Sequence, residues 1–181
     1  MFRFLVQRMI TAFEKRYDYD ASYLRAMYDI SPVAFRKFGA VTKLAAHREV
    51  VPVAASYAAK LVGTLIEDCG PCTQIVVNMA REAGMNDAQI EAVLKADLDA
   101  MAADTALGFR FATAIVSGSA DADEARQAVR ARWGERGVVD LTFALQGSRI
   151  YPMVKAGLGF ATACQRISVG SRAVDIIGRA A

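Results

Sequence analysis

The tetrapeptide Cys69–Gly70–Pro71–Cys72 stands between two runs of residues that favour helix, and this placement limits the folds open to the chain. Residues 53–66 are apolar and rich in alanine, and residues 73–83 contain no proline or glycine. Cys69 is therefore expected at or just before a helix N-terminus, where free N–H groups and the helix dipole lower a thiol pKa. A thiolate with a second thiol one turn away is what thiol–disulfide chemistry requires.

The composition favours an all-α protein. The chain has 181 residues, a length that fits one domain with a substantial core. Alanine is abundant, there are only four prolines, and runs of β-branched residues are short. The net charge is +3, and the lysines and arginines are scattered among nearly as many acidic residues. Because nucleic-acid binding calls for a basic stripe, we expect no nucleic-acid partner.

The distribution of apolar residues predicts a cytoplasmic protein without a transmembrane segment. No run of about 18 apolar residues is present. Residues 1–17 lack the small-residue cleavage site of a signal peptide, and charges interrupt their apolar run. Three cysteines, of which two are close in sequence, do not make a secreted disulfide scaffold. In a reducing compartment, a CxxC pair is typically catalytic, redox-active or metal-binding.

Hydrophobic periodicity and capping residues predict a series of helices. The first, residues 2–17, is amphipathic, and two interpretations of it stay open: a membrane-surface or partner-binding helix, or a helix packed on its own domain or on a neighbouring subunit. In the first half of the chain, further helices are predicted from Asp20 or Ser22 to about 29, from Pro32 to about His47 with Ser31 as N-cap, over 53–66, and from the cysteines to Gly84. In the second half, they are predicted from Asn86 or Asp87 to about 96, from Asp97 or Asp99 to about 116, from Asp121 or Asp123 to 132, and over 138–150. A last helix runs from there through Cys164, and Pro152 starts or kinks it.

The remaining sequence suggests one compact domain with an extension. Residues 168–181 form a weakly patterned tail, and no repeat or low-complexity linker is present. We therefore describe residues 1–47 as an N-terminal helical extension and residues 48–181 as the main helical domain.

The order of these segments resembles the carboxymuconolactone decarboxylase / alkylhydroperoxidase AhpD-like family. The resemblance covers roughly residues 50–165 and rests on the CxxC at a helix start, the Gly84–Met85–Asn86 turn, Trp133–Gly134, and residues 138–141 opening a helix. It implies an all-α AhpD-like bundle that forms homo-oligomers and acts as an antioxidant peroxidase or disulfide-exchange enzyme. The implied substrates are a small peroxide or disulfide and an external thiol reductant, with no cofactor and no metal.

The chain departs from the family at the positions that usually relay protons. A histidine usually follows the second cysteine by four residues, where this chain has Val76. Some members also place a histidine between the cysteines, where Pro71 stands. A glutamate usually sits about twelve residues before the first cysteine, where Tyr57 stands. In the family's pattern, the sheltered Cys72 is the thiol that attacks peroxide or the resolving thiol that re-forms the disulfide, and Cys69 exchanges with the external reductant.

Two further residues complete the candidate site, each with an open alternative. Glu67, next to Asp68, is the ionisable group nearest to Cys69, or it points into solvent and helps to start the next helix. Tyr57 faces the cysteines as a hydrogen-bond donor, or it is an ordinary core tyrosine. The predicted catalytic set is Cys69, Cys72, Tyr57 and Glu67. His47, the only histidine, is assigned to a helix C-terminus, and Cys164 to the core.

The cysteine pair has three other interpretations. CGPC is also the thioredoxin tetrapeptide, but a thioredoxin fold places it after a buried strand and a tryptophan, whereas here a predicted helix precedes it and the only tryptophan is Trp133. A structural zinc site needs four ligands, and one chain offers a single pair, Cys164 and one histidine. A catalytically inactive oligomeric scaffold or binding protein stays open as the alternative to the oxidoreductase.

Overall fold

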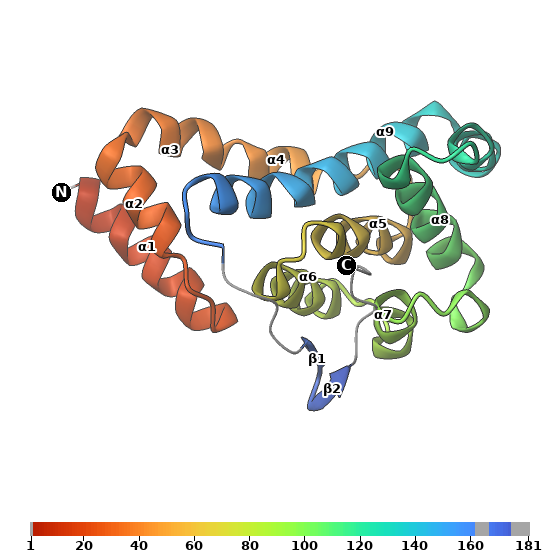
Figure 1. Cartoon of the computed structure of the whole chain (residues 1–181), viewed down its shortest axis with the longest axis horizontal. Coiled ribbons are helices and arrows are strands. Elements are labelled where there is room, and N and C mark those ends of the chain that lie inside the picture. The colour runs from red at the N-terminus through yellow and green to blue at the C-terminus, as the bar shows by residue number, and fades with distance from the viewer. Residues whose placement is uncertain (1, 162–166, 175–181) are drawn as a thin grey trace.

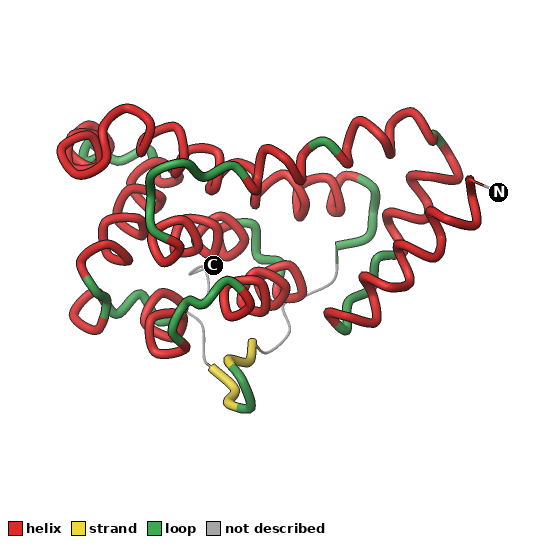
Figure 2. The backbone as a smooth tube through the Cα atoms, turned by 180° about the vertical axis from the view of Figure 1, so that it is seen from behind, coloured by secondary structure: helices red, strands yellow, loops and turns green. Residues whose placement is uncertain are grey.

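The structure, a computed structural model, describes residues 2–161 and 167–174. These residues form an all-α bundle with one small antiparallel hairpin, which confirms the predicted fold class (Figures 1 and 2). No helix in this part of the chain combines the length and the apolar character needed to cross a membrane. The elements are α1 (Phe2–Tyr17), α2 (Ser22–Ile30), α3 (Pro32–Gly39), α4 (Val41–Ala46), α5 (Val53–Ile66), α6 (Gly70–Glu82), α7 (Asp87–Leu94), the 3-10 helix η1 (Leu98–Ala100), α8 (Ala103–Ser117), α9 (Ala122–Gly157), β1 (Ile167–Val169) and β2 (Arg172–Val174).

Helix α5 is the centre of the bundle, with α6, α8 and α9 packed around it (Figure 1). Its apolar residues supply two core clusters, one shared mainly with α6 and α7 and the other with α8 and α9. A helix that is apolar on most of its faces is stable only when neighbours cover all of them. The alanine-rich run therefore becomes the helix that leads directly into the cysteine pair.

Small residues let these helices approach closely. A Cβ atom added to Gly63 would lie 2.2 Å from Oγ of Ser148 on α9. One added to Gly108 would lie 2.3 Å from the carbonyl oxygen of Ala55, where α8 crosses α5. The α5–α8 contact is thus between backbones and leaves no room for a side chain at position 108.

Gly108→Ala is expected to destabilise the protein by about 2 kcal/mol, since the added methyl meets backbone atoms that cannot rotate away. Chemical denaturation monitored by circular dichroism measures this difference. Gly39→Ala is the matched control, because open space surrounds its added Cβ, and it is expected to be neutral or to stabilise by up to about 1 kcal/mol. Equal free energies of unfolding in the two variants would contradict the close approach.

The N-terminal segment forms an aromatic cluster of its own beside the bundle. Tyr19 packs edge-on against Phe13 and Tyr23, with ring centroids 5.9 and 6.5 Å apart. Ile75 of α6 packs against the same cluster, and Arg16 pairs with Glu82 at the end of α6. The C-terminal end of α1 is thereby tied to the end of α6, whereas α4 lies along α9 (Figure 1). The boundary at residue 47 stays a prediction.

Several predicted boundaries are wrong, and nonlocal contacts explain two of them. The predicted helix from Pro32 to His47 is divided at Ala40 into α3 and α4. The helix predicted from Asp97 or Asp99 starts only at Ala103: the Gln89 side chain bonds the N–H of Ala102 and the carbonyl of Ala100, which interrupts the chain there.

Helix α9 is longer than the helices predicted in this region, and one of the two predicted breaks is absent. Gly134 has φ +70° and kinks the helix at the predicted break at Trp133–Gly134. The expected break before Pro152 is absent, and the helix continues to Gly157 rather than to Cys164. Pro152 is buried on α9, where packing against α4 and α5 holds the helix together despite the missing N–H. Cys164 itself lies outside the described residues.

Part of the predicted tail is a β-hairpin. Ile167 pairs with Val174 and Val169 with Arg172 around a turn at Gly170, where φ is +62°. The amide of Gln74 on α6 bonds both the N–H and the carbonyl of Ser168, at 2.7 and 2.9 Å, which docks the hairpin on the bundle.

Candidate functional site

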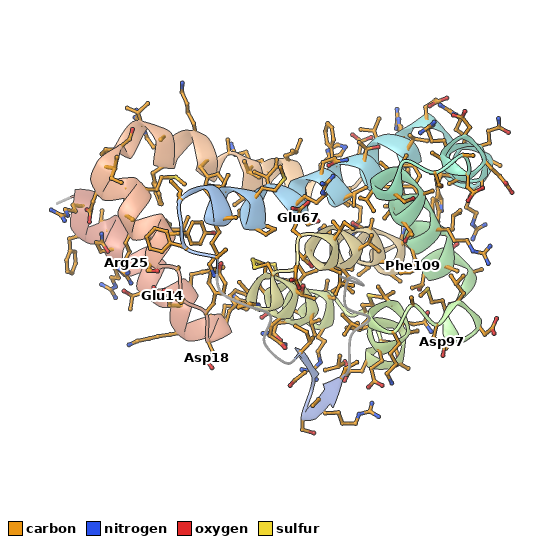
Figure 3. All side chains as sticks on the ribbon, viewed as in Figure 1. Glu14, Asp18, Arg25, Glu67, Asp97 and Phe109 are labelled. Carbon is orange, nitrogen blue, oxygen red and sulfur yellow. A yellow bond between two sulfur atoms is a disulfide. The ribbon has the colours of Figure 1, made fainter. Side chains whose placement is uncertain are left out.

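The two cysteines of the tetrapeptide form a disulfide at the start of α6 (Figure 3). Their Cα atoms are 5.2 Å apart, within the ordinary range for a bridge. Cys69 is the N-cap residue of α6, and its Sγ accepts a hydrogen bond from the backbone N–H of Cys72 at 3.3 Å. Cys72 is only 6% exposed, whereas Cys69 is half-buried. The first sulfur is thus the more accessible, and it receives an N–H bond that would stabilise a thiolate.

The corner between α5 and α6 is fixed by the two residues just before the disulfide. Asp68 adopts φ +49°, a left-handed conformation that aspartate tolerates better than most residues. Both Nε and Nη2 of Arg149 lie 2.7 Å from Oε1 of Glu67. This ion pair ties the corner to α9 (Figure 3 labels Glu67). Glu67 therefore pairs with an arginine rather than pointing freely into solvent, and the pair holds the loop that carries Cys69.

Tyr57 lies towards the end of α6 that is opposite to the disulfide. It stands nine residues before Ile66, about 13 Å along the helix axis from the end of α5. Burial raises the pKa of Tyr57, and the nearby Glu82 at the far end of α6 raises it further. The Nζ atom of Lys60 lies 4.4 Å from the ring centroid of Tyr57. Burial, with a smaller contribution from Arg48, lowers the pKa of Lys60 to about 8.

A cleft of about 580 Å³ opens at the disulfide loop. Pro71, between the two cysteines, forms part of its wall. Lys155 of α9 lines the same cleft and is only 3% exposed. The remaining wall comes from the end of α1 and the turn into α2, through Glu14, Lys15, Asp18, Tyr19 and Asp20 (Figure 3 labels Glu14 and Asp18).

A second cleft, of about 820 Å³, lies between α8 and the start of α9. Its wall includes Leu98, Met101 and Phe109 and contains no cysteine or histidine. This cleft is larger, but of the two clefts it is the first that touches the cysteine loop, through Pro71.

The sequence analysis missed a buried carboxylate on α9. Oδ2 of Asp140 accepts hydrogen bonds from the backbone N–H groups of Glu49, Val50 and Val51 at 2.9, 2.8 and 3.1 Å. Its Oδ1 lies 3.3 Å from Nε2 of His47. Burial alone would raise the pKa of Asp140, but the three N–H bonds and His47 together outweigh it and lower that pKa. The predicted placement of His47 just after a helix C-terminus is confirmed, since it follows α4.

No signal in the sequence marked Lys155, which is a single charged residue within an apolar helical stretch. Asp140 belongs to residues 138–141, on which the family resemblance rests, but nothing local predicted its hydrogen bonds to residues 49–51. Within residues 2–161 and 167–174, no three histidine, cysteine, aspartate or glutamate side chains are grouped as metal ligands would be. Comparison with known protein families, with curated proteins and with solved structures finds no match to this chain.

Proposed function

We propose that this protein is a thiol–disulfide oxidoreductase whose Cys69–Cys72 pair cycles between dithiol and disulfide. The observation that carries the proposal is the N–H bond from Cys72 to Sγ of Cys69 at the start of α6. This bond and the helix dipole favour the thiolate of Cys69, which is both the nucleophile and the better leaving group in exchange. Cys69, the more exposed sulfur, exchanges with the external reductant, and Cys72 is the resolving thiol.

The reductive half of the cycle consumes an external dithiol. One of its thiolates attacks Sγ of Cys69, the Cys69–Cys72 bond breaks, and Cys72 leaves as a thiolate that takes a proton. The second thiolate of the reductant attacks its own sulfur in the mixed disulfide and releases Cys69. The reductant leaves as a disulfide, and the protein has gained two electrons and one proton, which Cys72 holds while Cys69 stays a thiolate.

We propose a small hydroperoxide as the oxidant, the substrate class implied by the AhpD-like resemblance. The Cys69 thiolate attacks one peroxide oxygen, the O–O bond breaks, and the leaving alkoxide takes a proton to become an alcohol. The resulting sulfenic acid condenses with the Cys72 thiol, so that the disulfide forms again and water leaves. Membership of that family is part of the proposal, supported by the CxxC at the start of α6 and the order of the helices.

The test is dithiol-dependent consumption of a hydroperoxide by the purified protein, in a Cys164→Ser background that removes the third sulfur. The wild-type pair is expected to turn over, and Cys69→Ser/Cys72→Ser is expected to fall to the uncatalysed rate. Titration of free thiols before and after peroxide should show the loss of two thiols per chain, restored by the dithiol. Equal peroxide consumption with and without the cysteine pair would contradict the proposal.

The second candidate function is an oligomeric binding scaffold, favoured by an apolar surface on α1. Phe4, Leu5 and Met9 are 68, 55 and 56% exposed and lie on one side of this helix. We propose that this face joins copies of the chain into a homo-oligomer, as the resemblance implies. Leu5→Glu/Met9→Glu should then reduce the mass measured by light scattering. A scaffold without redox activity predicts that the wild-type oligomer forms with no turnover.

A further inference from the structure

The disulfide loop shares its cleft with a buried lysine that the cycle described above does not use. Lys155 is 3% exposed, and its Nζ atom lies 4.8 Å from the ring centroid of Tyr19. Within residues 2–161 and 167–174, this Tyr19 ring is the contact that the structure gives the ammonium. A lysine so deeply buried is rare unless it has a partner or a function.

The other charged groups of the cleft either have partners or are exposed at its rim. Glu14 is paired with Arg25 and also accepts the N–H of Ala21. The carboxylate of Asp20 accepts a hydrogen bond from the N–H of Ser22 at 2.9 Å. It also raises the pKa of Lys155, but burial lowers that pKa by more. Lys15 and Asp18 are exposed at the rim. Of the two lysines that line the cleft, Lys155 is the buried one, and it shares the cleft with Pro71 of the cysteine loop.

We infer that Lys155 is the cationic partner of the reduced Cys69–Cys72 pair and the proton donor to the leaving group. The inference rests on the proposed function and supplies the proton relay that Val76, Pro71 and Tyr57 do not provide. In the reduced protein, the ammonium stabilises the thiolate across the cleft. When the thiolate attacks a hydroperoxide, the Lys155 ammonium gives its proton to the alkoxide, and the neutral amine regains a proton from solvent.

The titration of Lys155 fits this role. Burial lowers the pKa of Lys155, with Asp20 opposing, so the ammonium releases a proton more readily than a lysine in solvent does. Tyr19 does not compete as the donor, because burial raises its pKa to about 12. Turnover is therefore expected to decline on the alkaline side as Lys155 loses its proton.

The thiol pKa provides the first test and requires no turnover. In reduced protein carrying Cys164→Ser, Lys155→Met should raise the Cys69 thiol pKa by about one unit and slow its alkylation near neutral pH about tenfold. Lys155→Arg should restore both values, since arginine keeps the charge. Lys60→Met is the matched control: this lysine is also buried over a tyrosine ring but does not line the cleft, and its loss should leave the thiol pKa unchanged.

The pH profile of hydroperoxide turnover provides the second test. Lys155→Arg should keep the low thiol pKa and lose the alkaline decline, with a reduced kcat because arginine does not release its proton at these pH values. An unchanged thiol pKa in Lys155→Met, or an equal shift in Lys60→Met, would overturn the inference. A wild-type protein with a low thiol pKa but no turnover would instead overturn the proposed function, and the two failures are thus distinguishable.

Discussion

Cys72→Ser is expected to be captured as a stable mixed disulfide with an external thiol reagent, whereas Cys69→Ser is expected to be captured slowly. The backbone N–H of residue 72 still reaches Sγ of Cys69 after the Cys72→Ser change, so the accessible thiol keeps its stabilised thiolate. In Cys69→Ser, the remaining thiol is the 6% exposed Cys72. We expect alkylation near neutral pH to be at least about tenfold faster in Cys72→Ser, and turnover to be lost in both.

Mass spectrometry of the trapped adduct and the rate of iodoacetamide alkylation measure this asymmetry. Both variants should carry Cys164→Ser, so that a single sulfur is left to react in each. Circular dichroism shows whether both remain folded, since removing the disulfide also removes a cross-link. Faster capture of Cys72 than of Cys69 would reverse the assigned roles of the two sulfurs.

Local signals in the sequence were sufficient for the part of the fold that carries the cysteines. The bounds Val53–Ile66 follow from a mostly apolar, alanine-rich run between Pro52 and Glu67, and the structure has the same bounds. Ser31 was predicted as an N-cap, and its Oγ accepts the N–H of Ala34 at 3.2 Å. Asn86 likewise caps α7, with Oδ1 2.8 Å from the N–H of Ala88. Short-range hydrogen bonds of this kind are encoded within a few residues.

The elements that were missed depend on contacts between distant residues. Helix α9 passes through Pro152 because other helices pack against it, and a proline pattern alone argues for a break. The hairpin had a local signal, the alternation of Ile167, Val169 and Val174 around Gly170, but its docking requires Gln74 of α6. The same is true of the site, because the cleft that joins Lys155 to Pro71 comes from residues more than eighty positions apart.

Asp140→Ala is expected to be among the most destabilising single substitutions in the chain. The change leaves three backbone N–H groups without their acceptor, and that of Val51 is in a fully buried residue. We expect a loss of about 3 kcal/mol in the free energy of unfolding, which lowers Tm by about 6–12 °C. Asp29→Ala is the matched control, since its carboxylate makes an exposed ion pair with Arg3, and it should change stability by less than about 1 kcal/mol.

The pH dependence of this loss identifies the ionised carboxylate as its source. The pKa of Asp140 is lower in the folded protein than in the unfolded chain, where an aspartate has a pKa of about 3.9. Its contribution is therefore fully present above the unfolded value and is lost as the pH falls through the folded pKa. The difference in unfolding free energy between wild type and Asp140→Ala should be constant near neutral pH and should shrink in acid.

Asp140→Asn separates the charge of this side chain from its shape. The amide keeps one acceptor oxygen for the N–H groups of residues 49–51 but loses the charge that strengthens these bonds. It should lose less stability than alanine, and the asparagine side chain contributes no acid titration of its own. Because these N–H groups lie just before α5, a weaker anchor should also loosen the start of the helix that leads to Cys69. Hydrogen exchange of the α5 amides should then increase in Asp140→Ala, and unchanged exchange there would show that α5 is held by its packing alone.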